Sequence, residues 1–388
     1  MTSLPPLIMT SEKGSFARET IEERKPKIIE RILSHFDYNP AIREDLLSLK
    51  SELRDQIIQF LDEETSDQAD WNKALEPWAE KTWLEIPWFL AETYFFRRVL
   101  QAVRYFQPGP WMGNDPYARL KENEIAKGLG VFNETFQPAK SATLEDFTSI
   151  CYRVLWGNRG DLSNLDRFEI NMDEQPDQIV IDDVESVFRY LKRKNHNKIA
   201  YILDNIGSEL YFDLAMMDYL LLSGFAGSIT CYLKNQPFYV SDAMPDDLFQ
   251  TLERMSASDL SNVSMLAERI SQAIRAGIIS LEAPPFFTSS AMYREMPEIL
   301  HRQMSKYDLT ILKGDVNYRR LVGDRHWEPT TPVSKAAGYF PSSWVSFRTL
   351  KSELILGLSH ETYSKLERES ESDWLTNGQR GMITFLEK

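Results

Sequence analysis

Four side chains that follow apolar runs of the sequence could together bind a metal ion and a phosphate group. Asp204 and Asn205 come directly after KIAYIL, and Asp242 ends the segment KNQPFYVSD that follows SITCYL. Lys313 closes the run DLTILK and precedes Gly314. Carboxylate and amide oxygens are hard ligands that suit Mg²⁺ or Mn²⁺, and a lysine beside a glycine can neutralise a phosphate oxygen. We therefore predict a metal-plus-phosphate site, provided that the three runs are neighbouring strands.

Each of these positions also has a simpler structural interpretation. Asp204 or Asn205 could cap a helix that starts near Ile206, and Asp242 could cap a helix that starts near Pro245. Lys313 could be a solvated lysine in a turn. Any one position alone favours the simpler interpretation, so the prediction of a site depends on the three segments meeting in space.

Several common catalytic motifs do not occur in the sequence. There is no GxxxxGK[ST] segment for a phosphate-binding loop, and GLGVFN at 128–133 lacks the third glycine of a dinucleotide fingerprint. The five histidines form no HExxH or HxH pattern, and no GxSxG segment is present. The sequence therefore gives no support to a P-loop enzyme, a zinc hydrolase or a serine hydrolase.

The elements that would position these residues are strands alternating with helices from about residue 175 onward. Apolar runs without polar alternation indicate strands that are buried on both faces, as in a parallel sheet covered by helices. Ligands bind such sheets at the carboxyl ends of the strands. We predict an α/β domain with a largely parallel, Rossmann-like sheet flanked by helices. The expected strands are QIVIDD, KIAYILDN, SITCYLKN, DLTILKGD, SELILGLS and GMITFLEK.

The first part of the chain reads as helical. The segments 18–36 and 41–64 carry apolar residues at helical spacing among many charges. The segment 82–106 is far more apolar, which is typical of a buried central helix, and Pro87 indicates its start. We predict an all-α domain over 1–145 and an α/β domain that carries the metal site over 146–388.

A carboxylate in the apolar central helix needs a partner. Glu92 lies in this helix, and Arg97 or Arg98 is near it in sequence. Glu92 is therefore interpreted either as half of a structural ion pair or as a residue that binds substrate.

Charge and composition restrict the classes of partner. The formal net charge is -14 with a pI of about 5.0, so binding to nucleic acid or to an anionic membrane is not expected. The chain has two cysteines, Cys151 and Cys231, which are far apart and belong to no pair motif. They indicate a reducing compartment without a disulfide framework. The N-terminus has no signal-peptide pattern, and the apolar stretch 214–233 is interrupted by polar residues, so we expect a cytoplasmic protein.

Two motifs resemble those of the metal-dependent damage-control phosphatases, formerly domain of unknown function 89. DNIGSEL at 204–210 is similar to the family's DNxGxEL, and KGDVNY at 313–318 is similar to its KGxxNY. Asp315 stands where that motif usually has a small residue. WFLAETY at 88–94, WGNRGDLS at 156–163 and FRTLK at 347–351 resemble the branch with a helical domain. That branch includes the acidic-residue methyltransferase 1-like proteins and sugar-phosphate phosphatases.

The resemblance implies a divalent-metal-dependent phosphomonoester hydrolase acting on a small phosphorylated metabolite, for example a sugar phosphate such as fructose 1-phosphate. The implied metal is Mg²⁺, Mn²⁺, Co²⁺ or Ni²⁺, held by Asp204, Asn205 and Asp242. Asp204, Asn205 and Lys313 would be the catalytic residues. The residues expected to bind substrate are Glu92, Arg97, Asn158, Arg159, Asp161, Glu209, Asn317, Arg348 and Lys351.

Two other functions remain open at this point. The first is an S-adenosylmethionine-dependent methyltransferase acting on protein glutamate carboxyl groups, since strand-Asp-x-x-Gly is similar to a nucleotide-binding loop. Such loops use several glycines, however, and here Ser208 and Glu209 follow Gly207. The second is a non-catalytic sugar-phosphate binder, which would need no activating metal.

Overall fold

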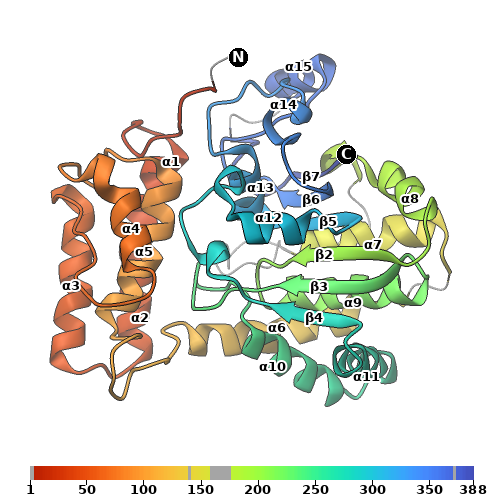
Figure 1. The fold of residues 1–388 in the computed structure, drawn as a ribbon, viewed down its shortest axis with the longest axis horizontal. Coiled ribbons are helices and arrows are strands. Elements are labelled where there is room, and N and C mark those ends of the chain that lie inside the picture. The colour runs from red at the N-terminus through yellow and green to blue at the C-terminus, as the bar shows by residue number, and fades with distance from the viewer. Residues whose placement is uncertain (1–3, 139–140, 158–175, 370–372) are drawn as a thin grey trace.

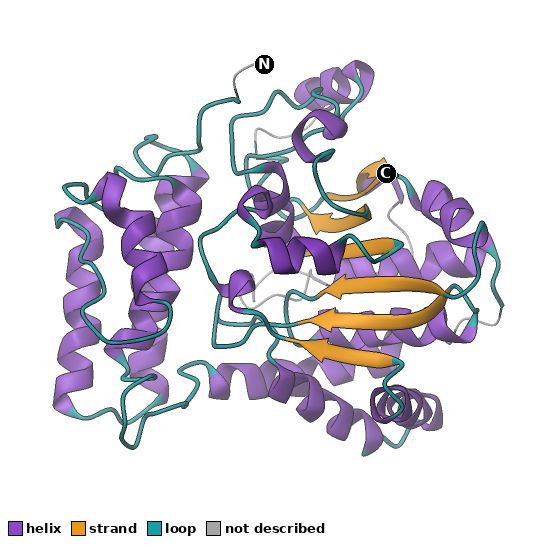
Figure 2. Ribbon diagram, in the orientation of Figure 1, coloured by secondary structure: helices purple, strands orange, loops and turns teal. Residues whose placement is uncertain are grey.

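The computed structural model describes residues 4–138, 141–157, 176–369 and 373–388. The described chain has a seven-stranded sheet with helices on both faces and a further group of helices beyond the carboxyl ends of its strands (Figures 1 and 2). This arrangement confirms the predicted α/β class. The strands are β1 Ile179–Asp182, β2 Asn197–Ile202, β3 Ala226–Tyr232, β4 Ile279–Glu282, β5 Leu309–Lys313, β6 Ser343–Thr349 and β7 Gly381–Leu386.

The strand order is β1-β7-β6-β5-β2-β3-β4. Neighbours are parallel except β6 and β7, which are antiparallel. The strands that carry the predicted site residues, β5, β2 and β3, lie side by side in the middle of the sheet. Their carboxyl ends therefore open at one edge, as the sequence analysis assumed.

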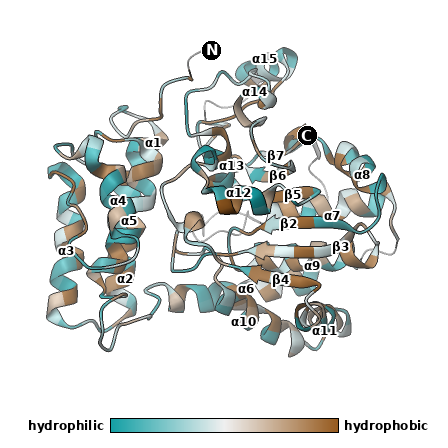
Figure 3. Cartoon of the chain, in the orientation of Figure 1, coloured by the Kyte–Doolittle hydropathy of each residue, from teal (hydrophilic) through white to brown (hydrophobic). Residues whose placement is uncertain are grey.

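Alternate residues of the strands face two separate cores. Ile199 and Tyr201 of β2 pack on one face, with the long apolar helix α9 (Ser208–Leu222). Ala200 and Ile202 pack on the other face, with α12 (Glu298–Met304). Figure 3 shows the apolar residues concentrated along the strands. Because both faces are covered, β5 is buried over its whole length, which explains why its sequence LTILK does not alternate regularly between apolar and polar residues.

Two strands and one loop differ from the sequence prediction. β4 and β6 were not predicted, and the strand predicted at 352–359 is wrong, because this stretch has no regular secondary structure. β6 reads SWVSFRT, and its polar residues Ser346 and Arg348 are fully buried. Polar and apolar residues alternate in β6 as they would in a half-exposed strand, although both faces of β6 are buried. The apolar residues of 354–358 instead fill a core beside the sheet as an irregular segment.

The helices fall into two groups. The first group packs around its own core of Ile, Leu and aromatic side chains, and α5 is buried on almost every side. The second group covers the sheet. The helices are α1 Phe16–Glu19, α2 Lys25–His35, α3 Pro40–Asp55, α4 Gln68–Leu75 and α5 Trp88–Ala102 in the first group, and α6 Ala118–Thr135, α7 Leu144–Trp156, α8 Val184–Lys192, α9, α10 Pro245–Ser256, α11 Ser261–Arg275, α12, α13 Gly314–Val322, α14 Val333–Ala337 and α15 His360–Glu369 in the second.

The two groups of helices share side-chain packing. Trp88 and Phe89 at the start of α5 join Tyr318 and Val322 of α13 in one apolar cluster. α6 lies before residue 145, yet its Ile125 packs in the core that surrounds the sheet. A division of the chain at residue 145 stays a prediction. No helix within the described residues is long and apolar enough to cross a membrane.

Candidate active site

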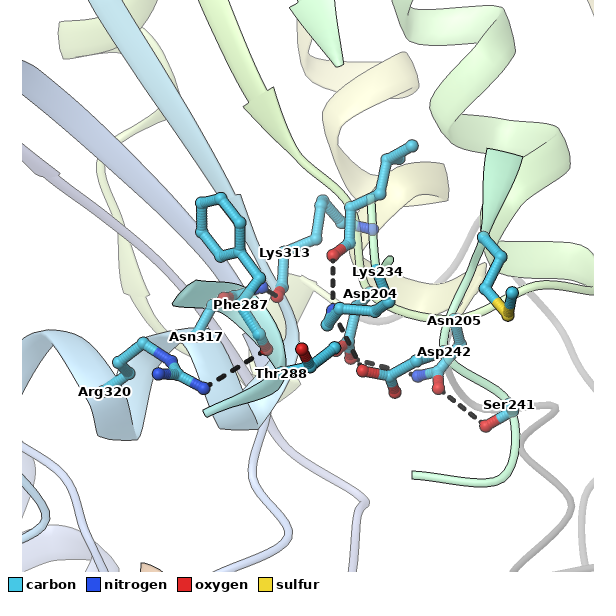
Figure 4. Close-up of polar contacts among 12 residues, drawn as sticks. Asp204, Asn205, Lys234, Ser241, Asp242, Phe287, Thr288, Lys313, Asn317 and Arg320 are labelled. Carbon is cyan, nitrogen blue, oxygen red and sulfur yellow. Dashed lines mark hydrogen bonds and ion pairs between the residues drawn. The ribbon is translucent and has the colours of Figure 1, made fainter. Parts of the chain in front are cut away.

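The loops after β2 and β3 are joined by backbone hydrogen bonds at the carboxyl edge of the sheet. Asn205 and Asp242 form an isolated antiparallel bridge, and the backbone N–H of Ala243 donates to the carbonyl oxygen of Asp204 over 2.8 Å. This pairing holds the side chains of Asp204, Asn205 and Asp242 close together (Figure 4). The structure therefore brings the three predicted metal ligands to one place.

These three side chains do not serve as helix caps. α9 begins at Ser208 after Gly207, and no side chain caps its first turn. α10 begins at Pro245, as predicted, but its N-cap residue is Met244. The interpretation of Asp204 and Asp242 as simple caps is therefore wrong.

The segment that follows β5 contacts Asp204 at a glycine. Gly314 starts α13 with a φ of 80°, and a Cβ atom built there would lie only 1.8 Å from Oδ2 of Asp204. Only glycine tolerates both the left-handed backbone and this contact. The glycine of the KGxxNY segment is therefore required so that the carboxylate can sit over the start of α13.

The two carboxylates of the site are buried and repel each other. Asp204 is 5% exposed and Asp242 is 1% exposed. Burial raises the pKa of Asp204 well above its usual range, and the negative charge of Asp242 raises it further. Burial also raises the pKa of Asp242, against the opposing effect of Lys234. A cation bound between the two carboxylates would offset their mutual repulsion.

Asn205 has its amide orientation fixed by its neighbours. Its Nδ2 donates to Oδ2 of Asp204 over 3.0 Å and to Oε2 of Glu209 over 3.1 Å. The Ser241 hydroxyl donates to its Oδ1 over 2.7 Å. A carbonyl oxygen has two lone pairs, so Oδ1 keeps the capacity to bind a metal. Glu209 and Ser241 thus act as positioning residues for Asn205.

Lys313 does not take the position that the sequence prediction gave it. Its ammonium is 2.9 Å from both Glu209 and Asp213, and the side chain is 1% exposed. In Figure 4 the side chain extends away from Asp242. Burial lowers the pKa of Lys313, but Asp213 and Glu209 outweigh this effect and hold the pKa above its usual value. Lys313 is a permanently charged residue that positions Glu209.

Lys234 was missed by the sequence analysis. It follows β3, is 3% exposed, and its ammonium lies 2.9 Å from Oδ2 of Asp242. A lysine directly after a buried strand run, as in CYLKN, was the available signal. It gives Asp242 a counter-charge and so fixes the carboxylate in place.

The predicted ligands line a cavity of about 300 Å³ between the sheet edge and the first helices. Its walls come from the loops after β2 and β3, from the start of α13, and from helices near the N-terminus. Two consecutive wall residues, Tyr239 and Val240, have φ values of 46° and 65°. Left-handed backbone is costly for such residues and often occurs at functional sites. The residues that line the cavity include Glu19, Glu23, Arg24, Lys27, Arg31, Glu92, Asp204, Asn205, Asp242, Asp315, Val316 and Lys351.

The sequence also matches known proteins over most of its length. The model of the damage-control phosphatase ARMT1-like domain matches residues 20–366. The chain belongs to this family. The damage-control phosphatase ARMT1 of Mus musculus is 28% identical over 439 aligned positions, which cover 99% of each chain. That of Danio rerio is also 28% identical, covering 98% of this chain and 97% of the relative. The predicted resemblance to damage-control phosphatases is therefore confirmed at the level of the family.

A solved structure supports the fold. The crystal structure of a DUF89 family protein from Pyrococcus horikoshii aligns with a TM-score of 0.50 and covers 95% of this chain and 97% of the other. The sequence identity is 14%, so this likeness concerns the fold alone. It agrees with the mostly parallel sheet described above.

Two of the residues expected to bind substrate in this damage-control phosphatase line the cavity. They are Glu92 and Lys351. Glu92 pairs with Lys25, so its predicted pairing with Arg97 or Arg98 is wrong. Residues five or six apart on a helix point in different directions, whereas neighbours on one face are three or four apart. Lys351 comes shortly after β6, which neighbours β5.

Three other expected residues are held in structural contacts. Arg97 bonds Glu63 and Asp67 inside the first group of helices, away from the cavity lining. The Arg348 guanidinium is fully buried and pairs with Asp315 over 2.6 Å. Asn317 donates to the backbone oxygen of Lys313 and accepts from Tyr293, which secures the start of α13. Asn158, Arg159 and Asp161 lie outside the described residues.

The donor set fits a hard divalent cation. Two buried carboxylates and one oriented amide offer oxygen ligands of the kind that Mg²⁺ and Mn²⁺ prefer. No group of three or more His, Cys, Asp or Glu side chains arranged for a metal occurs in the described part of the chain. The third proposed donor in this family member is the amide oxygen of Asn205. A bound cation would offset the mutual repulsion of Asp204 and Asp242.

Proposed function

We propose that this damage-control phosphatase is a divalent-metal-dependent hydrolase of small phosphorylated metabolites, with sugar phosphates such as fructose 1-phosphate as substrates. The observation that carries the proposal is the convergence of Asp204, Asn205 and Asp242 on the wall of one cavity. The family supports phosphatase chemistry, and the cavity is large enough for a phosphorylated sugar.

Asp204, Asn205 and Asp242 would hold the metal. A divalent cation bound there would supply Lewis-acid chemistry to a phosphate oxygen and lower the pKa of water. The chain's own contribution is to keep the three donors fixed. Ser241 orients the Asn205 amide, Lys234 orients Asp242, and the closely packed glycine of α13 leaves room for Asp204.

The phosphate would lie between the metal ligands and the start of α13. Asp315 and Val316, in the first turn of this helix, line the cavity. Backbone N–H groups of a helix N-terminus favour phosphate oxygens. Lys351 lines the same cavity and would neutralise part of the phosphate charge. In this proposal Lys351 takes the role that the sequence analysis gave to Lys313.

Glu92 would recognise a hydroxyl group of the substrate. It is 1% exposed and lines the cavity, and its Oε2 has no hydrogen-bond partner, whereas Oε1 accepts from Lys25. A buried acceptor without a partner is costly unless a ligand satisfies it. A sugar hydroxyl directed at Oε2 would do so, which favours polyol phosphates over simple alkyl phosphates.

A metal-by-substrate screen tests the proposal. Phosphate release is measured for a panel of sugar phosphates and alkyl phosphates with Mg²⁺, Mn²⁺, Co²⁺ or Ni²⁺, each against a chelator control. We expect release that needs a metal and favours sugar phosphates. Release that persists in the chelator would reject metal dependence. Ligand-induced melting shifts without any release would instead favour a non-catalytic binder.

A parallel incubation tests the rival transferase activity. The same protein is given labelled S-adenosylmethionine and a protein that carries exposed glutamates. We expect no label transfer above that of a heat-treated sample. Stoichiometric transfer would make the carboxyl methyltransferase the better description of this site.

A further inference from the structure

A second part of the cavity lining comes from a helical stretch near the N-terminus that carries charges of both signs, Glu19, Glu23, Arg24, Lys27 and Arg31. Arg24 and Arg31 both line the cavity, and they are seven residues apart, which is two turns of helix. Arg24 ends a π-helical segment, Thr20–Arg24, that leads into α2, and Arg31 lies within α2. The two guanidinium groups therefore belong to the same side of one continuous helical stretch.

Neither arginine forms an ion pair in the part of the chain that the structure describes. Within the described residues no carboxylate lies within 4 Å of the Arg24 or Arg31 guanidinium. Lys27 lies between them on the cavity wall, but Glu23 is 3.5 Å away and balances its charge. Both arginines are exposed to solvent, and both also line the cavity, so an anion that enters the cavity can contact them. Two cations facing one cavity without partners indicate an anionic ligand.

The neighbouring Lys25 does not fill this role itself. Its side chain is fully buried and is neutralised by Glu92. Burial lowers the pKa of Lys25 to about 8, against the charge of Glu92, and the positive charge of Arg24 lowers it further. The charge of Arg24 therefore acts on the neighbouring Lys25.

We propose that Arg24 and Arg31 form a second anion subsite, so that the preferred substrate carries a phosphate or carboxylate in addition to the ester that is cleaved. This inference rests on the proposed function, because the first phosphate is placed at Asp204, Asn205 and Asp242. Guanidinium groups match both anions through paired N–H donors. The substrate class is therefore a sugar bisphosphate or a phosphorylated sugar acid.

The test compares pairs of substrates that differ in the second anion. Fructose 1,6-bisphosphate is compared with fructose 1-phosphate, and 6-phosphogluconate with sorbitol 6-phosphate. The variants are R24Q/R31Q, which removes both charges, and R24K/R31K, which keeps the charges but not the planar donors. The matched control is R275Q/R302Q, which removes two exposed arginines from α11 and α12.

We expect R24Q/R31Q to lower kcat/KM for the member of a pair that carries the second anionic group on the order of tenfold more than for its partner. R24K/R31K should give a smaller loss, and the control should leave the ratio unchanged. The wild-type preference should shrink when salt is raised from 0.05 to 0.5 M, because exposed charges are screened. The pair that responds identifies phosphate or carboxylate as the second anion. Equal losses for both members of each pair would overturn the subsite.

A binding measurement separates this inference from the proposed function. Calorimetry on metal-free protein in chelator compares the affinities for the same pairs without requiring turnover. Tighter binding of the member that carries the second anionic group, abolished in R24Q/R31Q, supports the subsite even if no phosphate release is found. Equal affinities for the two members in wild-type protein would reject the subsite even if the phosphatase activity is present.

Discussion

At the scale of residues, the site contains two buried carboxylates that repel each other, and a bound cation would offset this repulsion. Asp204 and Asp242 are both buried, and both have raised pKa values, first because of burial. Neither carboxylate caps a helix, so no helix-capping contact offsets the free-energy cost of burying it. Such carboxylates are typical of functional sites in which stability is given up for activity.

The first prediction concerns Asp204→Asn, which keeps the shape of the side chain and removes its charge. We expect metal-dependent phosphate release to fall more than about 100-fold, because a metal ligand is weakened. In chelator the variant should be more stable than wild type by about 0.5–2 kcal/mol, because repulsion of Asp242 is removed. Urea denaturation in chelator and a phosphate-release assay measure the two effects. Asp246→Asn, on the exposed side of α10, is the control. Full activity in Asp204→Asn would contradict the site.

The second prediction concerns the buried pair of Lys25 and Glu92. Lys25→Met should destabilise the protein by about 3–5 kcal/mol, since it leaves a buried carboxylate without its partner. The double variant Lys25→Met/Glu92→Leu should recover much of this loss, because no charge then remains buried. A double-mutant cycle by urea denaturation measures the coupling. Additive losses would show that the pair is not coupled.

The third prediction is a pH dependence of stability caused by Lys25. Its pKa is lowered from 10.5 to about 8 by burial. Between these values the unfolded chain binds the proton and the native state does not, so the free energy of unfolding rises with pH, by at most about 1.4 kcal/mol per pH unit. Below pH 8 both states are protonated and the contribution is flat. The stability of wild type relative to Lys25→Met, measured at pH 7.5, 8.5 and 9.5, should therefore increase. A constant difference would argue against the lowered pKa.

At the scale of elements, glycines decide how closely the helices approach the site. α6 crosses the start of α9 at Gly128, where a Cβ atom would lie 2.4 Å from the backbone nitrogen of Ser208. The contact fixes the segment that follows Asp204 and Asn205. GLGVFN, which has glycines without a nucleotide-binding fingerprint, thus has a packing role.

The fourth prediction compares two glycines of the same helix. Gly128→Ala should destabilise the protein by about 1–3 kcal/mol and reduce activity, because α9 and the adjoining ligands must shift. Gly130→Ala should be neutral or stabilise it by up to about 1 kcal/mol, since a Cβ there meets nothing within 4 Å. Thermal melting and phosphate release on both variants provide the comparison. Similar effects of the two substitutions would contradict the close crossing.

Strand prediction succeeded where burial leaves a simple pattern. β2, β3 and β5 are short runs in which apolar residues predominate, and the sequence predicted them together with the polar residues at their ends. β6 was not predicted because it contains buried polar residues, of which Arg348 is held by a tertiary contact with Asp315. A single sequence does not show such contacts.

At the scale of the whole molecule, the two groups of helices are joined by a shared apolar cluster. Trp88 is central to it. Its indole N–H donates to Thr20, the guanidinium of Arg319 lies 3.5 Å from the ring centroid, and Phe16 packs at its side. The cluster therefore connects α1, which contributes Phe16 to the cavity lining, to the start of α5 and to α13.

The fifth prediction is that the protein unfolds in one cooperative transition. Because the cluster and α6 link the first helices to the sheet, calorimetric and van't Hoff enthalpies should agree. Trp88→Ala should cost about 3–5 kcal/mol and split the transition in two. Differential scanning calorimetry of both proteins provides the measurement. Two separate transitions in wild type would show that the helical part unfolds independently.

The sequence by itself determined the α/β class, the strand ends that carry Asp204, Asn205 and Asp242, and the family likeness. It could do so because buried parallel strands impose an apolar pattern, and because polar residues directly after them share one edge. Only the tertiary structure decided which cations face the cavity. Lys313 points into the core, whereas Lys351 and Arg24 reach the cavity from distant parts of the chain. Side-chain direction depends on packing between elements far apart in sequence, and no local pattern records it.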